Sequence, residues 1–270
     1  MFKKVGIVGN GFVGNALLEN FKNFVEVEVY DLVTDRSTIS LQGLVDFADV
    51  IFVCVPTPPN ADGSCNTIYV ENVVKYIYSM DKYANVVIKS TVPPGTTSAL
   101  AAKFPEMRLA FNPEFLTEAN SHNDFRDQKL IVIGSEVKQF RNQLREFYIQ
   151  FVLKCSKENT AKVVCVDSAE AEMFKYLANC FLATKLTFAN EIYQLCVSSG
   201  IDYSRLSQIA ELDERLGKTH WKVPGSDGKL GWGGSCFPKD TNALVSFAKT
   251  NDSPLVLLEQ AIDLNNKHRS

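Results

Sequence analysis

The stretch Gly9-Asn10-Gly11-Phe12-Val13-Gly14 follows the apolar run of residues 3–8 and leads into a helical pattern. Glycines at these positions permit a tight strand-to-helix turn and a close approach of the backbone to a ligand. A second β pattern, residues 25–30, ends at Asp31, twenty-two residues after Gly9. An acidic residue at this spacing binds ribose hydroxyls when the helix N-terminus holds a pyrophosphate. The stretch therefore predicts a dinucleotide site of Rossmann type.

Two other interpretations of this stretch remain, one for the glycines and one for the cofactor. The glycines could serve only a tight turn, with Asp31 as an ordinary surface residue. Arg36 could accept a 2′-phosphate, which would indicate NADP. Because Asp31 would repel that phosphate, we expect NAD.

The following residues alternate between short apolar runs and helical patterns. Apolar runs cover residues 50–55, 86–89, 108–111, 130–133 and 163–166. This alternation predicts the α/β class, a doubly wound parallel sheet with helices on both faces. Ligands bind such sheets beyond the carboxyl ends of the strands, where Thr57, Thr91 and Glu114 are expected.

From Ser168 onward the pattern is helical. One helix is expected over residues 168–199, and others over 202–216, 241–249 and 255–265, with a long loop at 217–234. We therefore expect a dinucleotide-binding domain at 1–166 and a helical central domain at 167–270.

The helical region contains one cysteine in an unusual setting, Gly231-Trp232-Gly233-Gly234-Ser235-Cys236-Phe237-Pro238-Lys239-Asp240. Cys236 is a candidate nucleophile, because Lys239 can favour a thiolate and Asp240 can accept a proton. A free cysteine is more often a small buried hydrophobe. Upstream, Lys175 and Asn179 are four residues apart and share a helix face, as an oxyanion-binding pair would.

Composition excludes several classes of protein. The 270 residues carry a net charge of −3, are 46% hydrophobic and 22% charged, and contain no apolar run long enough for a membrane span. A nucleic-acid partner is not expected at this charge. Seven cysteines without a Cys-x-x-Cys pair and without a signal peptide indicate reduced thiols and a cytoplasmic location. Three separated histidines form no cluster of metal ligands in the sequence, so a zinc site is not expected.

These stretches together resemble the UDP-glucose/GDP-mannose dehydrogenase family. The resemblance is carried by residues 9–14, Lys89-Ser90-Thr91-Val92-Pro93, Asn112-Pro113-Glu114-Phe115-Leu116, the helix with Lys175 and Asn179, and residues 231–240. It implies that Cys236 is the nucleophile and that Lys175 and Asn179 stabilise the oxyanion. It implies that Asp240 and Thr91 hold the reacting water. Glu114 would assist proton transfer and thioester hydrolysis.

The resemblance also implies binding residues. The residues expected to bind the cofactor are Gly9, Gly11, Phe12, Val13, Gly14, Asp31, Arg36, Thr57, Thr91, Glu118 and Lys239. The residues expected to bind the substrate are Glu114, Phe115, Leu116, Lys175, Asn179, Arg215, Trp232 and Gly233. Arg215 would reach the substrate of a second subunit, in a homodimer formed through the helices of residues 168–215.

The implied activity is the NAD-dependent, four-electron oxidation of the C6 alcohol of a nucleotide sugar to the uronic acid, with UDP-glucose as the expected substrate. GDP-mannose and a UDP-N-acetylhexosamine stay open as substrates. So do two other functions, a non-catalytic partner of a full-length dehydrogenase and a one-step hydroxyacid dehydrogenase. Family members continue into a second α/β domain that covers the nucleotide, whereas this chain stops at Ser270. We therefore expect weaker binding of substrate than of cofactor.

Overall fold

The computed structural model describes residues 1–117, 120–157 and 160–269. The described chain divides into two compact units. One contains residues 1–58 and 66–175, and the other contains residues 59–65 and 176–270. The division thus falls between residues 175 and 176, inside a long helix, whereas the change of sequence pattern was expected to place it between residues 166 and 167.

The first unit is built on a seven-stranded sheet with the order β2-β1-β3-β4-β5-β6-β7. The strands are β1 (Lys4–Val8), β2 (Glu26–Tyr30), β3 (Val50–Val53), β4 (Asn85–Ile88), β5 (Arg108–Phe111), β6 (Leu130–Gly134) and β7 (Lys162–Val166). All four residues of β3 are buried, as expected for a central strand covered on both faces. The expected α/β class and all seven strands are confirmed.

The sheet departs from the expected parallel arrangement at one pairing. β5 and β6 pair antiparallel through Phe111 and Gly134, whereas the other neighbouring strands pair in parallel. An alternation of strands and helices cannot show such a reversal, because a connection as long as residues 112–129 can return the chain in either direction.

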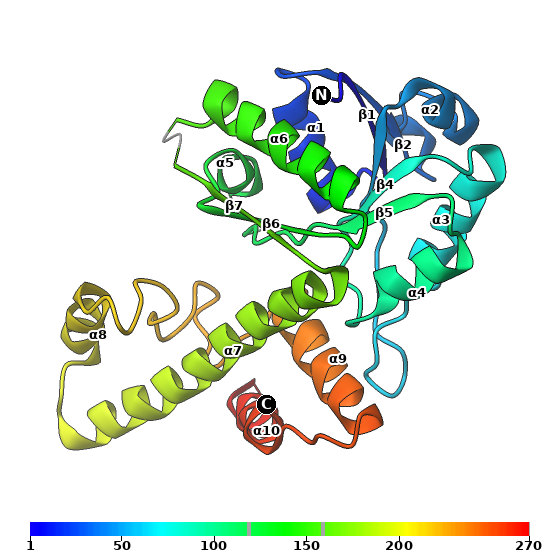
Figure 1. Ribbon diagram of the computed structural model, residues 1–270. Helices are drawn as coiled ribbons and strands as arrows, with labels where there is room; N and C mark the ends of the chain where they lie inside the picture. The colour runs from blue at the N-terminus through cyan, green and yellow to red at the C-terminus, as the bar shows by residue number, and fades with distance from the viewer. Residues whose placement is uncertain (118–119, 158–159, 270) are drawn as a thin grey trace. The chain divides into compact units, whose positions relative to one another are not determined.

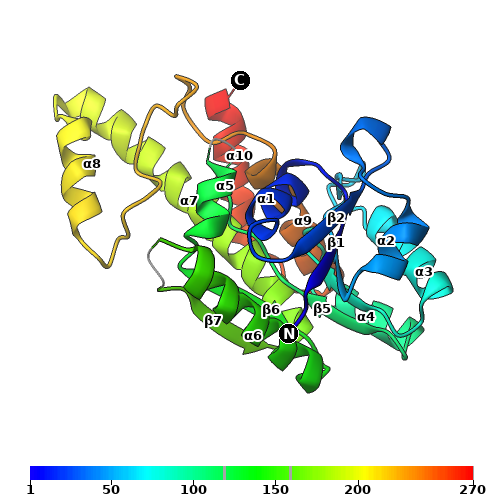
Figure 2. The same cartoon turned by 90° about the horizontal axis from the view of Figure 1, so that it is seen from above.

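Helices cover both faces of this sheet (Figure 1, Figure 2). On one face lie α1 (Phe12–Phe21), α5 (Ser121–Arg126) and α6 (Lys138–Cys155), which share an apolar core that includes Phe21, Phe125 and Phe147. On the other face lie α2 (Leu41–Phe47), α3 (Ile68–Met80) and α4 (Thr96–Lys103). Since both faces are covered, the ends of the strands are left for ligand binding.

The second unit is helical. It contains most of α7 (Ser168–Ser199), together with α8 (Tyr203–Leu212), α9 (Cys236–Thr250) and α10 (Val256–Arg269). Buried residues of α7, α9 and α10, among them Tyr176, Leu244 and Leu258, form one apolar cluster. In the described ranges no helix combines the length and hydropathy that a membrane span requires.

Three helix boundaries differ by four or more residues from the expected ones, and one of them is the end of α10 at Arg269 rather than Asn265. α8 ends at Leu212 rather than Leu216, and α9 begins at Cys236 rather than Thr241. Cys236 is therefore the first residue of a helix and not part of the preceding loop. Pro238 suggested a later start, but the first turn of a helix accepts proline because its N–H groups have no partner within the helix.

Candidate active site

The glycine loop between β1 and α1 has the geometry of a dinucleotide site. Gly9 has φ +94°, and a Cβ there would lie 2.9 Å from the carbonyl carbon of Cys54. At Gly14 a Cβ would lie 1.9 Å from the oxygen of Gly9, so the helix can approach the loop only without a side chain. Gly11 has no atom within 4 Å of its Cβ position, which leaves space for a ligand in front of α1. Phe12 and Val13 form the first turn of that helix.

Asp31 is held at the end of β2 beside this loop. Its two carboxylate oxygens accept hydrogen bonds from Asn10 N at 2.6 Å and Val33 N at 2.8 Å. The side-chain Nδ2 of Asn10 donates to the carbonyl oxygen of Arg36 at 2.9 Å. The side chain of Arg36 itself is exposed. Each oxygen of Asp31 has a further lone pair for a ribose hydroxyl. These residues fit a bound dinucleotide.

The other expected cofactor residues of this unit lie at or near strand ends. Thr57 follows β3 and is 7% exposed, and Thr91 follows β4 and is 9% exposed. Glu118 lies outside the described residues. Lys239 belongs to the second unit and is described with it below.

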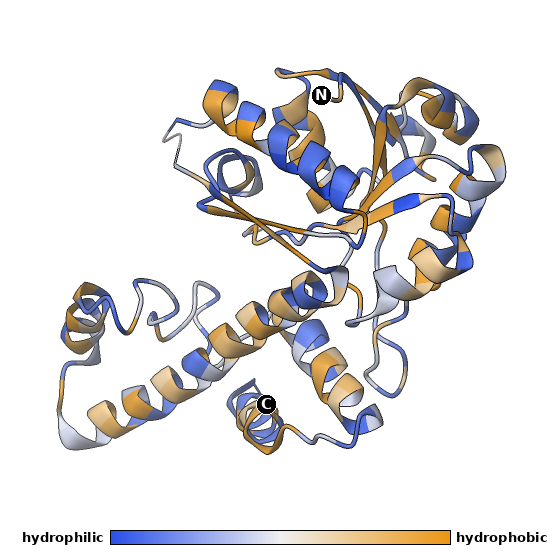
Figure 3. Cartoon of the chain, in the orientation of Figure 1, coloured by the Kyte–Doolittle hydropathy of each residue, from blue (hydrophilic) through white to orange (hydrophobic). Residues whose placement is uncertain are grey.

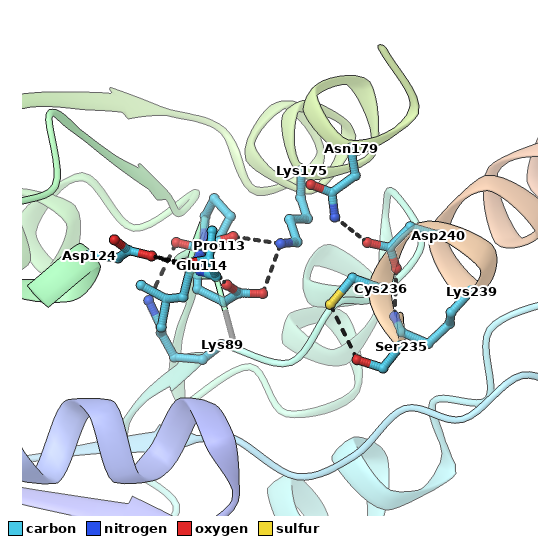
Figure 4. A network of polar contacts seen from close by, with 12 residues as sticks. Lys89, Pro113, Glu114, Asp124, Lys175, Asn179, Ser235, Cys236, Lys239 and Asp240 are labelled. Carbon is cyan, nitrogen blue, oxygen red and sulfur yellow. Dashed lines mark hydrogen bonds and ion pairs between the residues drawn. The ribbon is translucent and has the colours of Figure 1, made fainter. Parts of the chain in front are cut away.

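A buried ion pair joins Lys175 and Glu114 (Figure 4). The Lys175 ammonium donates to Glu114 Oε1 at 2.8 Å and to the Glu114 carbonyl oxygen at 2.6 Å. Burial alone would raise the pKa of Glu114, but the charge and hydrogen bond of Lys175 and the hydrogen bond from Leu116 N lower it below its usual value. Glu114 is thus ionised at neutral pH, although it is only 8% exposed.

The two residues after Glu114, Phe115 and Leu116, contact this ion pair. Leu116 N donates to Glu114 Oε2 at 2.8 Å, so the chain turns back on the carboxylate. The ring of Phe115 packs edge-on against Phe174, and its centroid lies 5.4 Å from the Lys175 ammonium. The expected substrate residues Phe115 and Leu116 are therefore brought together with the catalytic candidates Glu114 and Lys175.

In the second unit a hydrogen-bonded chain lies at the start of α9 (Figure 4). Asp240 is 1% exposed, and its two oxygens accept from Asn179 Nδ2 and from the Lys239 ammonium, each at 2.6 Å. Cys236 lies one helical turn before Asp240 and is partly exposed, with its sulfur 3.7 Å from the hydroxyl oxygen of Ser235. Lys239, which the sequence predicted to favour a Cys236 thiolate, pairs with Asp240.

The loop before Cys236 is anchored by residues that sequence analysis missed. Asn190 accepts from Gly231 N at 2.8 Å, and Asn265 both accepts from Trp232 N at 2.6 Å and donates to Trp232 O at 3.0 Å. The Trp232 indole N–H donates to Thr187 Oγ1 at 2.9 Å. Asn190 could have been found, because it follows Asn179 by eleven residues, three turns along the same helix. Asn265 gave no comparable signal.

Three expected substrate residues of this unit differ in their surroundings. Trp232 is only 4% exposed, so its indole supports the loop from inside. Gly233 is partly exposed and packs against the guanidinium of Arg269. Arg215 is exposed and pairs with Asp213 at 2.6 Å.

These features define a class: a dinucleotide-binding α/β protein whose helical unit carries a partly exposed cysteine at a helix N-terminus. No group of three or more His, Cys, Asp or Glu side chains is placed to hold a metal ion within the described ranges.

Comparison with known protein families agrees with this class. Residues 22–152 match the NAD binding domain of the UDP-glucose/GDP-mannose dehydrogenase family, and residues 169–267 match its central domain. The chain belongs to this family. The match confirms NAD as the cofactor, although the matched segment begins after the glycine loop.

Comparison with individual relatives shows how much of their length this chain aligns with. UDP-glucose 6-dehydrogenase TuaD of Bacillus subtilis is 31% identical, with 99% of this chain and 64% of that protein aligned. A UDP-glucose dehydrogenase structure from Pyrobaculum islandicum matches with a TM-score of 0.85 at 28% identity, covering 99% of this chain and 68% of that one. A GDP-mannose dehydrogenase structure from Pseudomonas aeruginosa matches with a TM-score of 0.69 at 26% identity, covering 98% and 68%. The chain spans about half to two thirds of the length of the curated relatives it matches.

Proposed function

We propose that this chain oxidises the C6 alcohol of a nucleotide sugar to the carboxylate in two NAD-dependent steps, with Cys236 as covalent nucleophile. The observation that carries the proposal is the polar face of α7. Lys175 is 3% and Asn179 8% exposed, one turn apart, and each holds a buried carboxylate, Glu114 and Asp240. Buried charges that are paired in this way cluster at functional sites.

The chain's own residues divide the chemistry between them. When bound at the glycine loop, NAD supplies the hydride acceptor for both oxidations. Glu114, ionised beside Lys175, is suited to take the alcohol proton, and the Lys175 ammonium is suited to stabilise the alkoxide.

The second oxidation needs the cysteine. The Cys236 sulfur adds to the aldehyde and gives a thiohemiacetal, whose oxyanion Lys175 and Asn179 would stabilise. Loss of a second hydride leaves a thioester on Cys236. Asp240, with both oxygens oriented by Asn179 and Lys239, is suited to orient the water that releases the acid. Each substrate thus consumes one water and reduces two molecules of NAD⁺.

Among the possible substrates, UDP-glucose is the one that the names of the relatives support. Several curated relatives that match this chain, from Bacillus subtilis, Rickettsia bellii and Pseudomonas aeruginosa, carry the name UDP-glucose 6-dehydrogenase. Because the solved structures that match include a GDP-mannose dehydrogenase, GDP-mannose belongs in the substrate panel. UDP-N-acetylhexosamines are added as the other substrates that the sequence left open.

We also propose a homodimer formed through α7. Its apolar side chains Leu177, Phe181, Phe188 and Leu195 are between 55% and 64% exposed, and α7 carries apolar residues along its whole length (Figure 3). Contiguous apolar surface of this kind usually marks an interface. A dimer would also give the exposed Arg215 access to a second subunit.

The NADH yield per sugar nucleotide tests the proposed chemistry. Two NADH per substrate support it, one indicates a single-step dehydrogenase, and none supports a non-catalytic binding partner. In Cys236→Ser we expect normal folding and NADH binding, but loss of acid formation by several orders of magnitude. Cys155→Ser, at another partly exposed cysteine, is the matched control. Undiminished turnover by Cys236→Ser, without a covalent adduct on the residue 236 peptide of wild type, would contradict the mechanism.

A further inference from the structure

A second buried lysine lies beside the Lys175–Glu114 pair, in the same unit. Lys89 directly follows β4 and is 2% exposed. Its ammonium donates to Asn112 Oδ1 at 3.0 Å and to the Pro113 carbonyl oxygen at 3.4 Å, and it lies 5.6 Å from the centroid of the Phe125 ring. Both acceptors are neutral oxygens. A buried charge held by neutral acceptors costs free energy on folding, so stability alone does not explain a lysine here.

The acceptor Asn112 is itself rigidly held. It is 1% exposed, its Nδ2 donates to Val132 O at 2.6 Å, and its Oδ1 also accepts from the buried hydroxyl of Tyr148. Its backbone N–H donates to Ile88 O, which ties it to β4. Lys89 is therefore attached to a point that the sheet and α6 fix from three sides.

Two lysines hold the backbone of Glu114. Lys89 contacts the carbonyl oxygen of Pro113, and Lys175 contacts the carbonyl oxygen of Glu114 itself at 2.6 Å. The peptide groups on both sides of Glu114 Cα are thus held by buried ammonium groups. Because these peptide groups set the direction of the Cα–Cβ bond, they also set the direction of the carboxylate.

We propose that Lys89 is a positioning residue for Glu114, which aims the carboxylate and keeps it ionised next to Lys175. The proposal rests on the proposed function, in which Glu114 takes a proton from the substrate. No contact of Lys89 with the substrate is required.

The charges around Glu114 agree with this role. Burial lowers the pKa of Lys89 to about 8, which keeps it mostly cationic at neutral pH, and its charge adds to that of Lys175 in lowering the pKa of Glu114. Cys54 faces Lys89 from the residue after β3, and burial raises the pKa of its thiol to about 12. Burial likewise raises the pKa of Tyr148. Cys54 and Tyr148 are therefore neutral. The charges that remain are those of Lys89, Lys175 and Glu114, whose sum of +1 suits the negative charge that develops on a substrate alkoxide.

Lys89→Met tests the proposal, because it removes the charge and keeps most of the side-chain volume. Lys75→Met removes the same charge from the exposed face of α3 and is the matched control, and Lys89→Arg keeps the charge. In protein labelled with ¹³C at the glutamate carboxyls, Glu114→Gln assigns the Glu114 signal. We expect Glu114 to titrate below 4.5 in the wild type, and about one unit higher in Lys89→Met, as loss of a nearby cation predicts. Lys89→Arg and Lys75→Met should leave the titration close to that of the wild type.

Activity and stability provide the second readout. We expect kcat of Lys89→Met to fall about 100-fold, the loss that a misplaced catalytic group causes, with little change in KM for NAD. The thermal midpoint should change little, since the relieved desolvation cost of the buried Lys89 charge offsets its lost attraction to Glu114. A purely structural lysine would show the opposite, a lower midpoint and unchanged kcat in the folded enzyme.

The titration separates this proposal from the proposed function. If the wild type oxidises no sugar nucleotide, the proposed function fails, while the NMR titration still decides whether Lys89 controls Glu114. An unchanged Glu114 titration in Lys89→Met overturns the role of Lys89. If that variant does not fold, a wild-type Glu114 that titrates at or above 4.5 overturns it as well.

Discussion

Replacing Asn265 with leucine tests whether the buried amide in α10 holds the loop that precedes Cys236. Asn265 Oδ1 accepts from Trp232 N at 2.6 Å and its Nδ2 donates to Trp232 O at 3.0 Å, and both residues are 4% exposed. Leucine is similar in size but makes neither bond, so the buried N–H and C=O of Trp232 lose these partners. At about 1–3 kcal/mol for each of these two unsatisfied groups, the free energy of unfolding should fall by about 2–6 kcal/mol.

The chain offers a selective assay and a control. Both tryptophans, Trp221 and Trp232, belong to the second unit, so urea unfolding followed by tryptophan fluorescence reports on that unit. Asn266→Leu makes the same change at the next, exposed position of α10 and should stay within about 0.5 kcal/mol of the wild type. If the two variants have the same urea midpoint and the same slope, the amide does not hold the loop and the reasoning is refuted.

Three further predictions concern the cofactor, the assembly and pH. The wild type should prefer NAD over NADP by about 100-fold, because the Asp31 carboxylate would repel a 2′-phosphate; comparable turnover with both cofactors at equal concentration would refute this. Phe181→Glu should convert the expected dimer into a monomer in light scattering, since it places a charge in the exposed apolar row of α7; a wild type that is already monomeric at micromolar concentration would refute the dimer. Burial raises the pKa of the Glu172 carboxyl to about 7 from 4.5, against the hydrogen bonds from Thr97 and Gly95 that lower it. The folded protein therefore keeps a proton that the unfolded chain loses, so about 3 kcal/mol of stability should be present below pH 4.5 and be lost as pH rises to 7. Glu172→Gln should flatten this loss in urea unfolding across that interval, and an equally steep loss in the variant would assign it to other groups.

Short-range patterns determined the first unit and part of the site. The step from β1 through the glycine loop to α1, and the position of Asp31 at the end of β2, follow from strand and helix periods over about thirty residues. The shared face of Lys175 and Asn179 follows from the helical repeat alone. For the same reason the whole of α7 could be predicted from its apolar periodicity, from Ser168 to Ser199.

Only the tertiary structure decided which side chains meet across the chain. Lys89 contacts Asn112 over 23 residues of sequence, Tyr148 contacts Asn112 over 36, and Asn265 contacts Trp232 over 33. No local period relates such positions, because the contacts arise when separate strands and helices pack against one another. The antiparallel pairing of β5 and β6 is decided in the same way. The sequence by itself therefore determined the residue types and the local elements that carry them, while packing decided that Lys89 supports Glu114 and that Asn265 holds the loop before Cys236.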